Sequence, residues 1–323
     1  MTKTDFYAAP LEGVTTYLWR RIHAEIFGGA DKYFTPFVSP NANCNFQTKE
    51  LDELTHNDGL PVVPQILTNS AEYFLWAARE MADMGYTEIN FNLGCPSGTV
   101  VAKRKGSGAL SDPAALDAML AEIFAGLPNG MHLSIKTRIG KKSLDEWPRL
   151  LEIYNQYPLH ELIVHPRIQT EFYKGRAHRE ILPETLERKT CPFSYNGDVF
   201  SPEEAQKVLT DYPQIDSIMV GRGLIADPAL LRKLHGGAPA TREELRAFHD
   251  AIYEAYRHRL SGDLNAIYRM RELWNYLRGN FRDTDQFLKK IRKAKNRADY
   301  MAAVDRLFSE NEMNPAPLPP MAK

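Results

Sequence analysis

The chain has 323 residues, 43% of them hydrophobic, and a formal net charge of -1 at pH 7. This length allows a full hydrophobic core and suits one barrel-sized domain plus a smaller one. No stretch reaches the roughly 18 apolar residues of a membrane span, and residues 1–5 lead into a strand pattern without the apolar region of a signal peptide. We therefore expect a soluble cytoplasmic protein with no membrane partner.

Short apolar strands alternate with longer helical patterns along the chain. The expected strands lie near residues 5–9, 33–38, 62–67, 87–92, 132–137, 161–165, 192–196 and 216–221. Helical patterns lie near residues 16–27, 70–84, 113–126, 144–156 and 202–211. Eight strands in strand–helix alternation predict the α/β class, as a (β/α)8 TIM barrel. An open doubly wound sheet would also alternate, but no GxGxxG motif follows the first strand.

The barrel is expected to occupy residues 1–236 and to be the catalytic domain. The stretch 234–241 has the composition of a linker, and Thr241 with Glu244 predicts a capping box at the start of the next helix. We expect an all-helical domain over 241–309. The proline-rich end, 310–323, is predicted to be a disordered tail.

Charge is unevenly distributed between these two domains. Residues 269–297 contain ten Lys or Arg against three acidic residues, a local charge of +7, so the remainder carries -8. This separation suggests an acidic body with a basic patch for a polyanion, although a solvated helix face also explains a charge run. The stripe formed by Ile267, Met270, Trp274, Leu277 and Phe281 is best explained as core.

One cysteine has an unusual setting. Cys95 follows an expected strand, where Gly94 permits a tight backbone path and Pro96 blocks further strand pairing. A cysteine at such a strand end can face a ligand, whereas Cys44 and Cys191 fit the common structural role of a free cysteine. The three cysteines form no CxxC pair, so we expect no metal site, no disulfide framework and a reducing compartment.

The ends of the other strands suggest a phosphate-bearing cofactor. Strands seven and eight end in the segments 196–198 (NGD) and 221–223 (GRG), which offer backbone N–H groups and one guanidinium group. Gln65, Lys136 and His165 end three further strands. Lys136 is suited to stabilising a reduced flavin, and His165 with Arg222 to holding its phosphate, so flavin mononucleotide (FMN) fits better than a metal.

Six motifs in order give the chain a resemblance to a known family. They begin at Ala9 (APLEG), Asn92 (NLGCPS), Lys136 (KTRIG), His165 (HPR), Asn196 (NGD) and Gly221 (GRG). Over nearly its whole length the chain resembles the tRNA-dihydrouridine synthases. The resemblance implies reduction of uridine to 5,6-dihydrouridine in tRNA or another folded RNA, by FMN that NADPH recharges. It also implies a flavin-binding barrel followed by a helical domain.

The resemblance implies a role for each matched residue. Cys95 matches the proton donor of the family. The positions that match flavin contacts are Pro10, Leu11, Glu12, Gln65, Lys136, His165, Asn196, Gly197, Asp198, Gly221 and Arg222. The segment 268–278 is similar to the C-type branch of the family. The implied RNA contacts are Asn92, Tyr173, Arg269, Arg271, Tyr276 and Arg292.

The chain departs from the C-type pattern at three places. Ser39 stands where that branch carries an arginine, Ile168 follows His165-Pro-Arg167 in place of the more usual threonine, and the loop 97–103 differs. These departures leave the modified nucleotide open. The sequence also leaves open tRNA against ribosomal RNA, NADPH against NADH, and the oligomeric state. We expect a monomer without an obligate protein partner.

Our mechanistic hypothesis divides the reduction into two transfers. Flavin N5 gives hydride to C6 of uracil, while Cys95 protonates C5 and must therefore be a thiol. Nearby lysines would lower the pKa of that thiol, so Lys103 and Lys105 are expected to approach the RNA instead.

The alternative is a small-molecule FMN-barrel oxidoreductase, such as a dihydroorotate or dihydropyrimidine dehydrogenase, for which the basic domain has no evident use. A catalytically silent RNA-binding protein would leave Cys95 and the strand-end residues unexplained.

Overall fold

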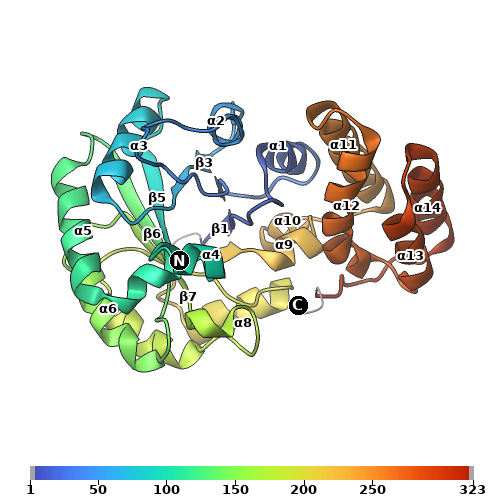
Figure 1. The fold of residues 1–323 in the computed structure, drawn as a ribbon. Coiled ribbons are helices and arrows are strands. Elements are labelled where there is room, and N and C mark those ends of the chain that lie inside the picture. Colours follow the sequence, from blue (N-terminus) through green and yellow to red (C-terminus); the bar gives the residue numbers. More distant parts are fainter. Residues whose placement is uncertain (1–3, 320–323) are drawn as a thin grey trace.

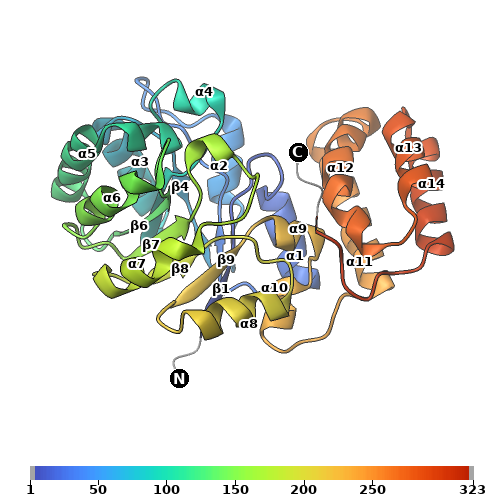
Figure 2. The same ribbon diagram turned by 90° about the horizontal axis from the view of Figure 1, so that it is seen from below.

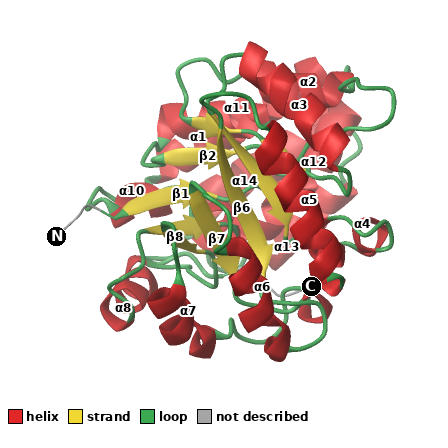
Figure 3. Ribbon diagram, turned by 90° about the vertical axis from the view of Figure 1, so that its left-hand side faces the viewer, coloured by secondary structure: helices red, strands yellow, loops and turns green. Residues whose placement is uncertain are grey.

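The computed structural model describes residues 4–319, and its centre is a sheet of parallel strands that closes into a barrel (Figure 3). The strand order is β3-β2-β1-β9-β8-β7-β6-β5-β4. The strands are β1 (Asp5–Ala8), β2 (Lys32–Phe34), β3 (Val62–Val63), β4 (Gln65–Ile66), β5 (Glu88–Leu93), β6 (His132–Arg138), β7 (Glu161–His165), β8 (Phe193–Tyr195) and β9 (Ser217–Val220).

The two outer strands of this order, β3 and β4, are one stretch of chain that Pro64 interrupts. Proline has no N–H to donate, so strand pairing breaks there, but the Pro64 carbonyl still accepts from Asn90 N at 2.9 Å. On the other side, Tyr33 pairs with Val62 and Val38 forms a bridge with Ile66. The stretch 62–66 therefore joins both ends of the sheet, and the eight expected strands and the barrel are confirmed.

Side chains alternate between the inside and the outside of the barrel. Tyr7, Phe34, Ile163 and Met219 form a small buried cluster of their own, whereas neighbours such as Phe6 pack in the large core under the helices. This alternation is the two-residue period of a strand, and it fills the barrel with side chains. The strand ends are left to form a site.

Helices surround the strands on the outside (Figures 1 and 3). The predicted ones are confirmed, and Ser70, Asp112 and Ser201 each accept a hydrogen bond from a first-turn N–H group. None of the described helices combines the length and hydropathy needed to span a bilayer. The α-helices of the barrel are α1 (Tyr17–Ile26), α2 (Thr48–Thr55), α3 (Ala71–Asp83), α4 (Gly98–Val101), α5 (Pro113–Gly126), α6 (Trp147–Tyr154), α7 (Leu182–Arg188), α8 (Pro202–Asp211), α9 (Arg222–Ala226) and α10 (Leu230–Leu234).

A second group of helices lies beside the barrel, nearest α1 and α9 (Figures 1 and 2). It comprises α11 (Arg242–Arg259), α12 (Asp263–Leu277), α13 (Asp285–Lys293) and α14 (Arg297–Glu310). The Thr241 hydroxyl accepts from Glu244 N at 3.1 Å, and the Glu244 carboxylate accepts from Thr241 N at 2.9 Å, so the predicted capping box forms. The predicted apolar stripe of α12 is buried.

Direct contacts fix the helical domain against the barrel. Phe248 of α11 packs edge-on against Trp19 and Phe27 of the α1 region, with ring centroids 6.1 and 5.3 Å apart. The Asn280 side chain, just after α12, donates to the Ala226 carbonyl at the end of α9 at 2.6 Å. As a result α12 is held next to α9, which begins with Arg222 directly after Gly221.

The segment after α14 differs from the prediction. Residues 311–318, expected to be a disordered tail, lie along the turn that follows α12: Asn314 N donates to Asn280 O at 2.8 Å and Leu318 N to Gly279 O at 3.0 Å. The turn offers unpaired carbonyl groups, and Gly279 allows close approach, because a Cβ there would be 2.3 Å from Leu318 O. Composition does not reveal this pairing. Residues 320–323 of the predicted tail lie outside the described residues.

Candidate active site

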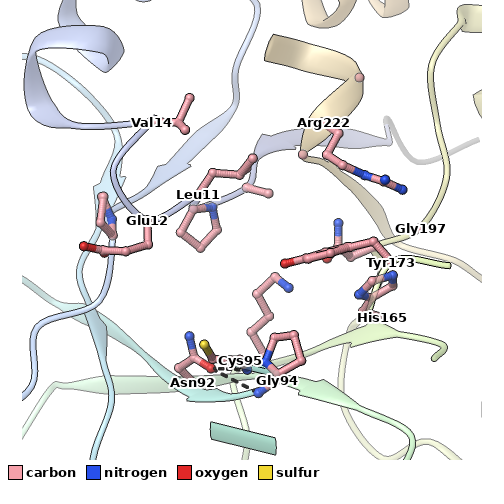
Figure 4. A pocket seen from close by; sticks show the side chains of 18 of the residues that line it. Leu11, Glu12, Val14, Asn92, Gly94, Cys95, His165, Tyr173, Gly197 and Arg222 are labelled. Atoms are coloured by element: carbon pink, nitrogen blue, oxygen red, sulfur yellow. Dashed lines mark hydrogen bonds between the residues drawn. The ribbon is translucent and has the colours of Figure 1, made fainter. Parts of the chain in front are cut away.

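A pocket of about 360 Å³ lies at the carboxyl ends of the strands, with Cys95, His165 and Arg222 among the residues around it (Figure 4). Residues of α12 also line it. All of the positions matched to flavin contacts line this pocket, together with Cys95 and three of the six expected RNA contacts. These residues are Pro10, Leu11, Glu12, Gln65, Lys136, His165, Asn196, Gly197, Asp198, Gly221 and Arg222, then Cys95, then Asn92, Tyr173 and Tyr276. The fold thus brings residues from seven strand ends and one helix to a single cavity.

Backbone contacts fix Cys95 at the edge of the pocket. The side-chain oxygen of Asn92 accepts from Cys95 N at 2.9 Å, and the Ser107 hydroxyl donates to Cys95 O at 2.8 Å. Gly106, at φ +55°, packs behind the cysteine, since a Cβ there would be 2.8 Å from Cys95 O. The loop after β5 therefore holds the cysteine from behind while its side chain lines the cavity.

The Cys95 thiol is protonated at neutral pH. Burial raises its pKa above the ordinary thiol value, and this effect outweighs the opposing influence of Arg138 and Lys136. Lys103 and Lys105 do not line the pocket, and Lys105 instead donates to the Ser39 hydroxyl at 3.0 Å. The group can therefore act as a general acid.

Below Cys95, a chain of buried amide side chains links three strands. Asn92 donates to Gln65 Oε1 at 2.7 Å, and Gln65 donates to Asn90 Oδ1 at 2.8 Å. Asn90 in turn donates to the Ser134 hydroxyl at 2.9 Å. Both the oxygen and the nitrogen of the Asn92 amide are thus engaged by the protein. The geometry gives Asn92 a role in placing Cys95, which the sequence motif alone does not indicate.

The opposite wall is packed tightly against the protein behind two of its glycines. A Cβ at Gly197 would lie 2.2 Å from the Tyr195 hydroxyl oxygen, and one at Gly223 would lie 2.1 Å from Val199 O, so only glycine fits. Asp198 accepts from Arg167 at 2.5 Å and from Arg222 at 3.0 Å. The carboxylate orients the two guanidinium groups and leaves other N–H groups of Arg222 to face the cavity.

His165 is neutral in this surrounding. Burial and the adjacent cations Arg138, Lys136 and Arg167 lower its pKa well below the ordinary value. Because arginine can only donate, His165 Nε2 accepts from Arg167 at 2.8 Å, which places the imidazole proton on Nδ1. The Nδ1–H group has no hydrogen-bond partner among residues 4–319, and it remains a donor for a ligand.

Lys136 carries an amine whose charged form is disfavoured by the protein groups around it. Burial and the nearby Arg138 lower its pKa to about 7, and within the described part of the chain its amine has no hydrogen-bond or salt-bridge partner. An anionic or strongly polar ligand bound beside this amine would favour its charged form.

The roof of the pocket contains residues that none of the six sequence motifs includes. Glu272 and Asn275 line it beside Tyr276, from one face of α12. Their spacing of three and four residues is the signal that places them together. Arg138 of β6 also lines the pocket, and it donates to Gly94 O, Ile168 O and Phe172 O at 3.0, 3.0 and 2.6 Å.

The expected arginine contacts lie farther out. Arg269 borders a smaller hollow next to the pocket, with its guanidinium group 5.9 Å from the Tyr256 ring centroid. Arg271 donates to Ala294 O at 2.8 Å, and Arg292 is exposed and donates to Asn275 Oδ1 at 3.4 Å. The three arginines therefore lie around the helical domain, outside the pocket itself.

Comparison with known proteins places this site in a family. The family model "Dihydrouridine synthase (Dus)" matches residues 7–312. The "Probable tRNA-dihydrouridine synthase 2" of Bacillus subtilis (strain 168) is 31% identical over 236 residues, which cover 71% of this chain and 71% of that protein. A "Probable tRNA-dihydrouridine synthase" of Staphylococcus epidermidis is also 31% identical over 236 residues, with the same coverage of both chains.

Solved structures share the barrel at much lower identity. Morphinone reductase has a TM-score of 0.52 at 12% identity, covering 76% of this chain and 88% of its own. A variant of NCR from Zymomonas mobilis has a TM-score of 0.52 at 15% identity, covering 75% and 90%. These two likenesses show the fold alone. The match over residues 7–312, with the two relatives at 31% identity, shows that the chain is an oxidoreductase of the dihydrouridine synthase family, which confirms the predicted resemblance.

Proposed function

We propose that this protein reduces uridine to 5,6-dihydrouridine in tRNA, with bound FMN as cofactor and NADPH as the electron donor. The observation that carries the proposal is the meeting of Cys95, the glycine-lined wall and Lys136 in one pocket beneath a basic helical domain. Family membership and the tRNA-directed names of the two relatives support the same substrate.

The residues of the pocket fit a flavin phosphate and ring. Gly197 and Gly223 present backbone without a side chain along the pocket, and Arg222 and His165 Nδ1–H supply donors for a phosphate. Lys136 would take up its proton beside the electron-rich part of a reduced ring, because negative charge there favours the ammonium form. FMN bound here would supply the hydride that adds to C6 of uracil.

Cys95 completes the reduction as the proton donor to C5. A thiol has a proton to give, and the raised pKa keeps Cys95 in that form at neutral pH. Asn92 and Ser107 fix the backbone of Cys95, so the residue loses little conformational freedom when the substrate binds. After each turnover the thiolate takes a proton back from solvent.

The helical domain would bind the RNA around the pocket. A stacked base must leave the RNA helix to reach Cys95, at a cost of a few kcal/mol that contacts to the RNA backbone must offset. Arg292 lies beside Asn275 of the roof, and Lys289, Lys290 and Lys293 are exposed on the same helix, α13. Tyr173 and Tyr276 line the pocket and offer rings to the extruded nucleotide.

The experiment follows the oxidation state of the flavin. The purified protein is reduced anaerobically with NADPH, then mixed separately with a tRNA transcript, uracil and orotate while the absorbance near about 450 nm is recorded. Rapid flavin reoxidation by tRNA alone, with dihydrouridine in the product, is expected. Reoxidation by uracil or orotate without tRNA would contradict the proposal. Dihydrouridine is then mapped in tRNA and ribosomal RNA from a strain that lacks the gene and from its parent. The uridine that is modified only in the parent strain is the position on which the protein acts.

A further inference from the structure

Phe172 is exposed at the rim of the active site, in the loop after β7. Its side chain is 44% exposed, and that of the next residue, Tyr173, which lines the pocket, is 47% exposed. Phe172 is the only phenylalanine among residues 4–319 with so much of its surface in solvent. Phe172 and Tyr173 thus place two adjacent exposed aromatic rings in one loop beside the pocket, where binding residues are commonly carried.

The backbone at Phe172 is held in an unfavourable conformation. Its φ is 52° and its ψ is -100°, a combination that bulky L-residues rarely adopt. The Phe172 N–H donates to Gln169 O at 3.2 Å, and its carbonyl accepts from Arg138 at 2.6 Å. Strain of this kind persists where surrounding contacts impose it, and it is concentrated at functional sites.

Arg138 ties this loop to the catalytic cysteine. Its guanidinium group is almost completely buried and also donates to Gly94 O, one residue before Cys95, at 3.0 Å. The same guanidinium group lies 5.4 Å from the Tyr173 ring centroid, and Arg222 lies 5.2 Å from it. The position of Phe172 is therefore set relative to Cys95, and two guanidinium groups lie near the ring of the neighbouring Tyr173.

The chemistry of this surface selects a nucleobase as its ligand. When the target base is extruded into the pocket, the neighbouring base loses a stacking partner at the pocket mouth. Exposed aromatic side chains next to cationic groups stack unpaired bases without regard to their identity. Phe172 offers such a ring at the lip, one residue from the Tyr173 side chain that lines the cavity.

This inference rests on the proposed function. We propose that Phe172 stacks on the nucleotide next to the target uridine and replaces the stacking partner that this nucleotide loses when the uridine is extruded. The strained backbone conformation holds the ring outward, and Arg138 couples its placement to that of Cys95. Phe172 is then a positioning residue for the RNA, not a part of the flavin site.

The test compares tRNA binding by Phe172→Ala, Phe172→Gly and Phe172→Tyr with that of the wild-type holoprotein. Loss of one base stack corresponds to about 1–3 kcal/mol, so the Ala and Gly variants should bind tRNA about 5- to 150-fold more weakly, and the Tyr variant nearly as well as wild type. Because these variants keep every cationic side chain that can reach a phosphate, the slope of log K against log salt should not change. Met84→Ala, an exposed apolar residue at the end of α3 near the other end of the barrel, is the matched control.

The glycine variant separates stacking from loop structure. Glycine adopts the Phe172 backbone conformation readily, so Phe172→Gly should raise the melting temperature while it weakens RNA binding. Wild-type affinity in the Ala and Gly variants, or weaker binding with a reduced salt slope, would overturn the stacking role. If wild type makes dihydrouridine and the variants match it, the inference alone fails. If wild type neither binds nor reduces tRNA, the proposed function fails and the inference with it.

Discussion

The side-chain oxygen of Asn92 accepts a hydrogen bond from the backbone N–H of Cys95 at 2.9 Å, so a residue of β5 fixes the backbone that carries the thiol. The Asn92 nitrogen is in turn anchored to Gln65 at 2.7 Å, inside the barrel. Cys95 is thus connected through two side chains to the rigid strands, an arrangement that can hold a reactive group in a constant position.

The first prediction concerns Cys95 itself. Cys95→Ala should lower the rate of dihydrouridine formation by about 10²–10⁴-fold, the usual contribution of one general acid. Flavin content and NADPH oxidation by other acceptors should persist, because the thiol is assigned to protonation of the base. Cys191→Ala is the control, since Cys191 precedes β8 and does not line the pocket. Normal dihydrouridine formation by the Cys95 variant would remove the residue from the mechanism.

A second prediction tests the phosphate corner of the pocket. Arg222→Ala removes the cation that Asp198 orients at 3.0 Å, and should weaken FMN binding by about 10- to 100-fold, the loss of one hydrogen bond to a charged group. Fluorescence quenching on titration of the flavin-free protein measures this affinity. Arg188→Ala changes a surface arginine that pairs with Glu184 and should bind FMN as wild type does. Equal FMN affinity in the two variants would show that Arg222 does not bind the FMN phosphate.

The strand ends of this site can be predicted from the sequence, whereas its roof cannot. Gln65, Lys136 and His165 follow from strand positions alone, because the carboxyl ends of parallel strands meet at one face of a barrel. Glu272 and Asn275 enter the pocket only because α12 packs beside α9, a long-range contact that no local pattern encodes.

Side-chain partners are likewise invisible in sequence. Asp198 and Asn92 are both placed correctly at the pocket, yet the structure shows that each is engaged by protein groups: Asp198 by two arginines and Asn92 by Cys95 and Gln65. The pairing of residues 311–318 with the turn after α12 depends on free carbonyl groups that exist only in the folded chain.

A third prediction addresses the basic helices. Changing Arg269, Arg271 and Arg292 to alanine should weaken tRNA binding and lower the slope of log K against log salt by about 0.7–0.9 for each phosphate that the protein no longer neutralises. Affinities at several salt concentrations, with the flavin spectrum as a check on folding, provide the measurement. Arg306→Ala on α14, where Arg306 pairs with Glu310, is the control. If the plots of log K against log salt for the triple variant and wild type coincide, these arginines do not bind the RNA.

The last prediction concerns Glu161, a buried carboxyl group at the start of β7, at the opposite end of the strands from the pocket. Its Oε1 accepts from the Ser217 hydroxyl at 2.7 Å, while Oε2 has no hydrogen-bond partner in the described structure. Burial raises the pKa of Glu161 from 4.5 to about 7. The folded state therefore holds this proton more tightly than the unfolded state, so the group's contribution to stability falls as pH rises from about 4.5 through 7.

Glu161→Gln keeps the shape of the side chain and cannot ionise. At pH 8 the variant should be more stable than wild type by up to about 3 kcal/mol, since raising a pKa by one corresponds to about 1.4 kcal/mol. At pH 5 the wild-type carboxyl group is already protonated in the folded state, so the difference should be small. Urea unfolding at both pH values measures this, with Glu152→Gln, a surface carboxylate paired with Arg149, as the control. A stability difference that is the same at pH 5 and pH 8 would show that Glu161 is not held protonated by burial.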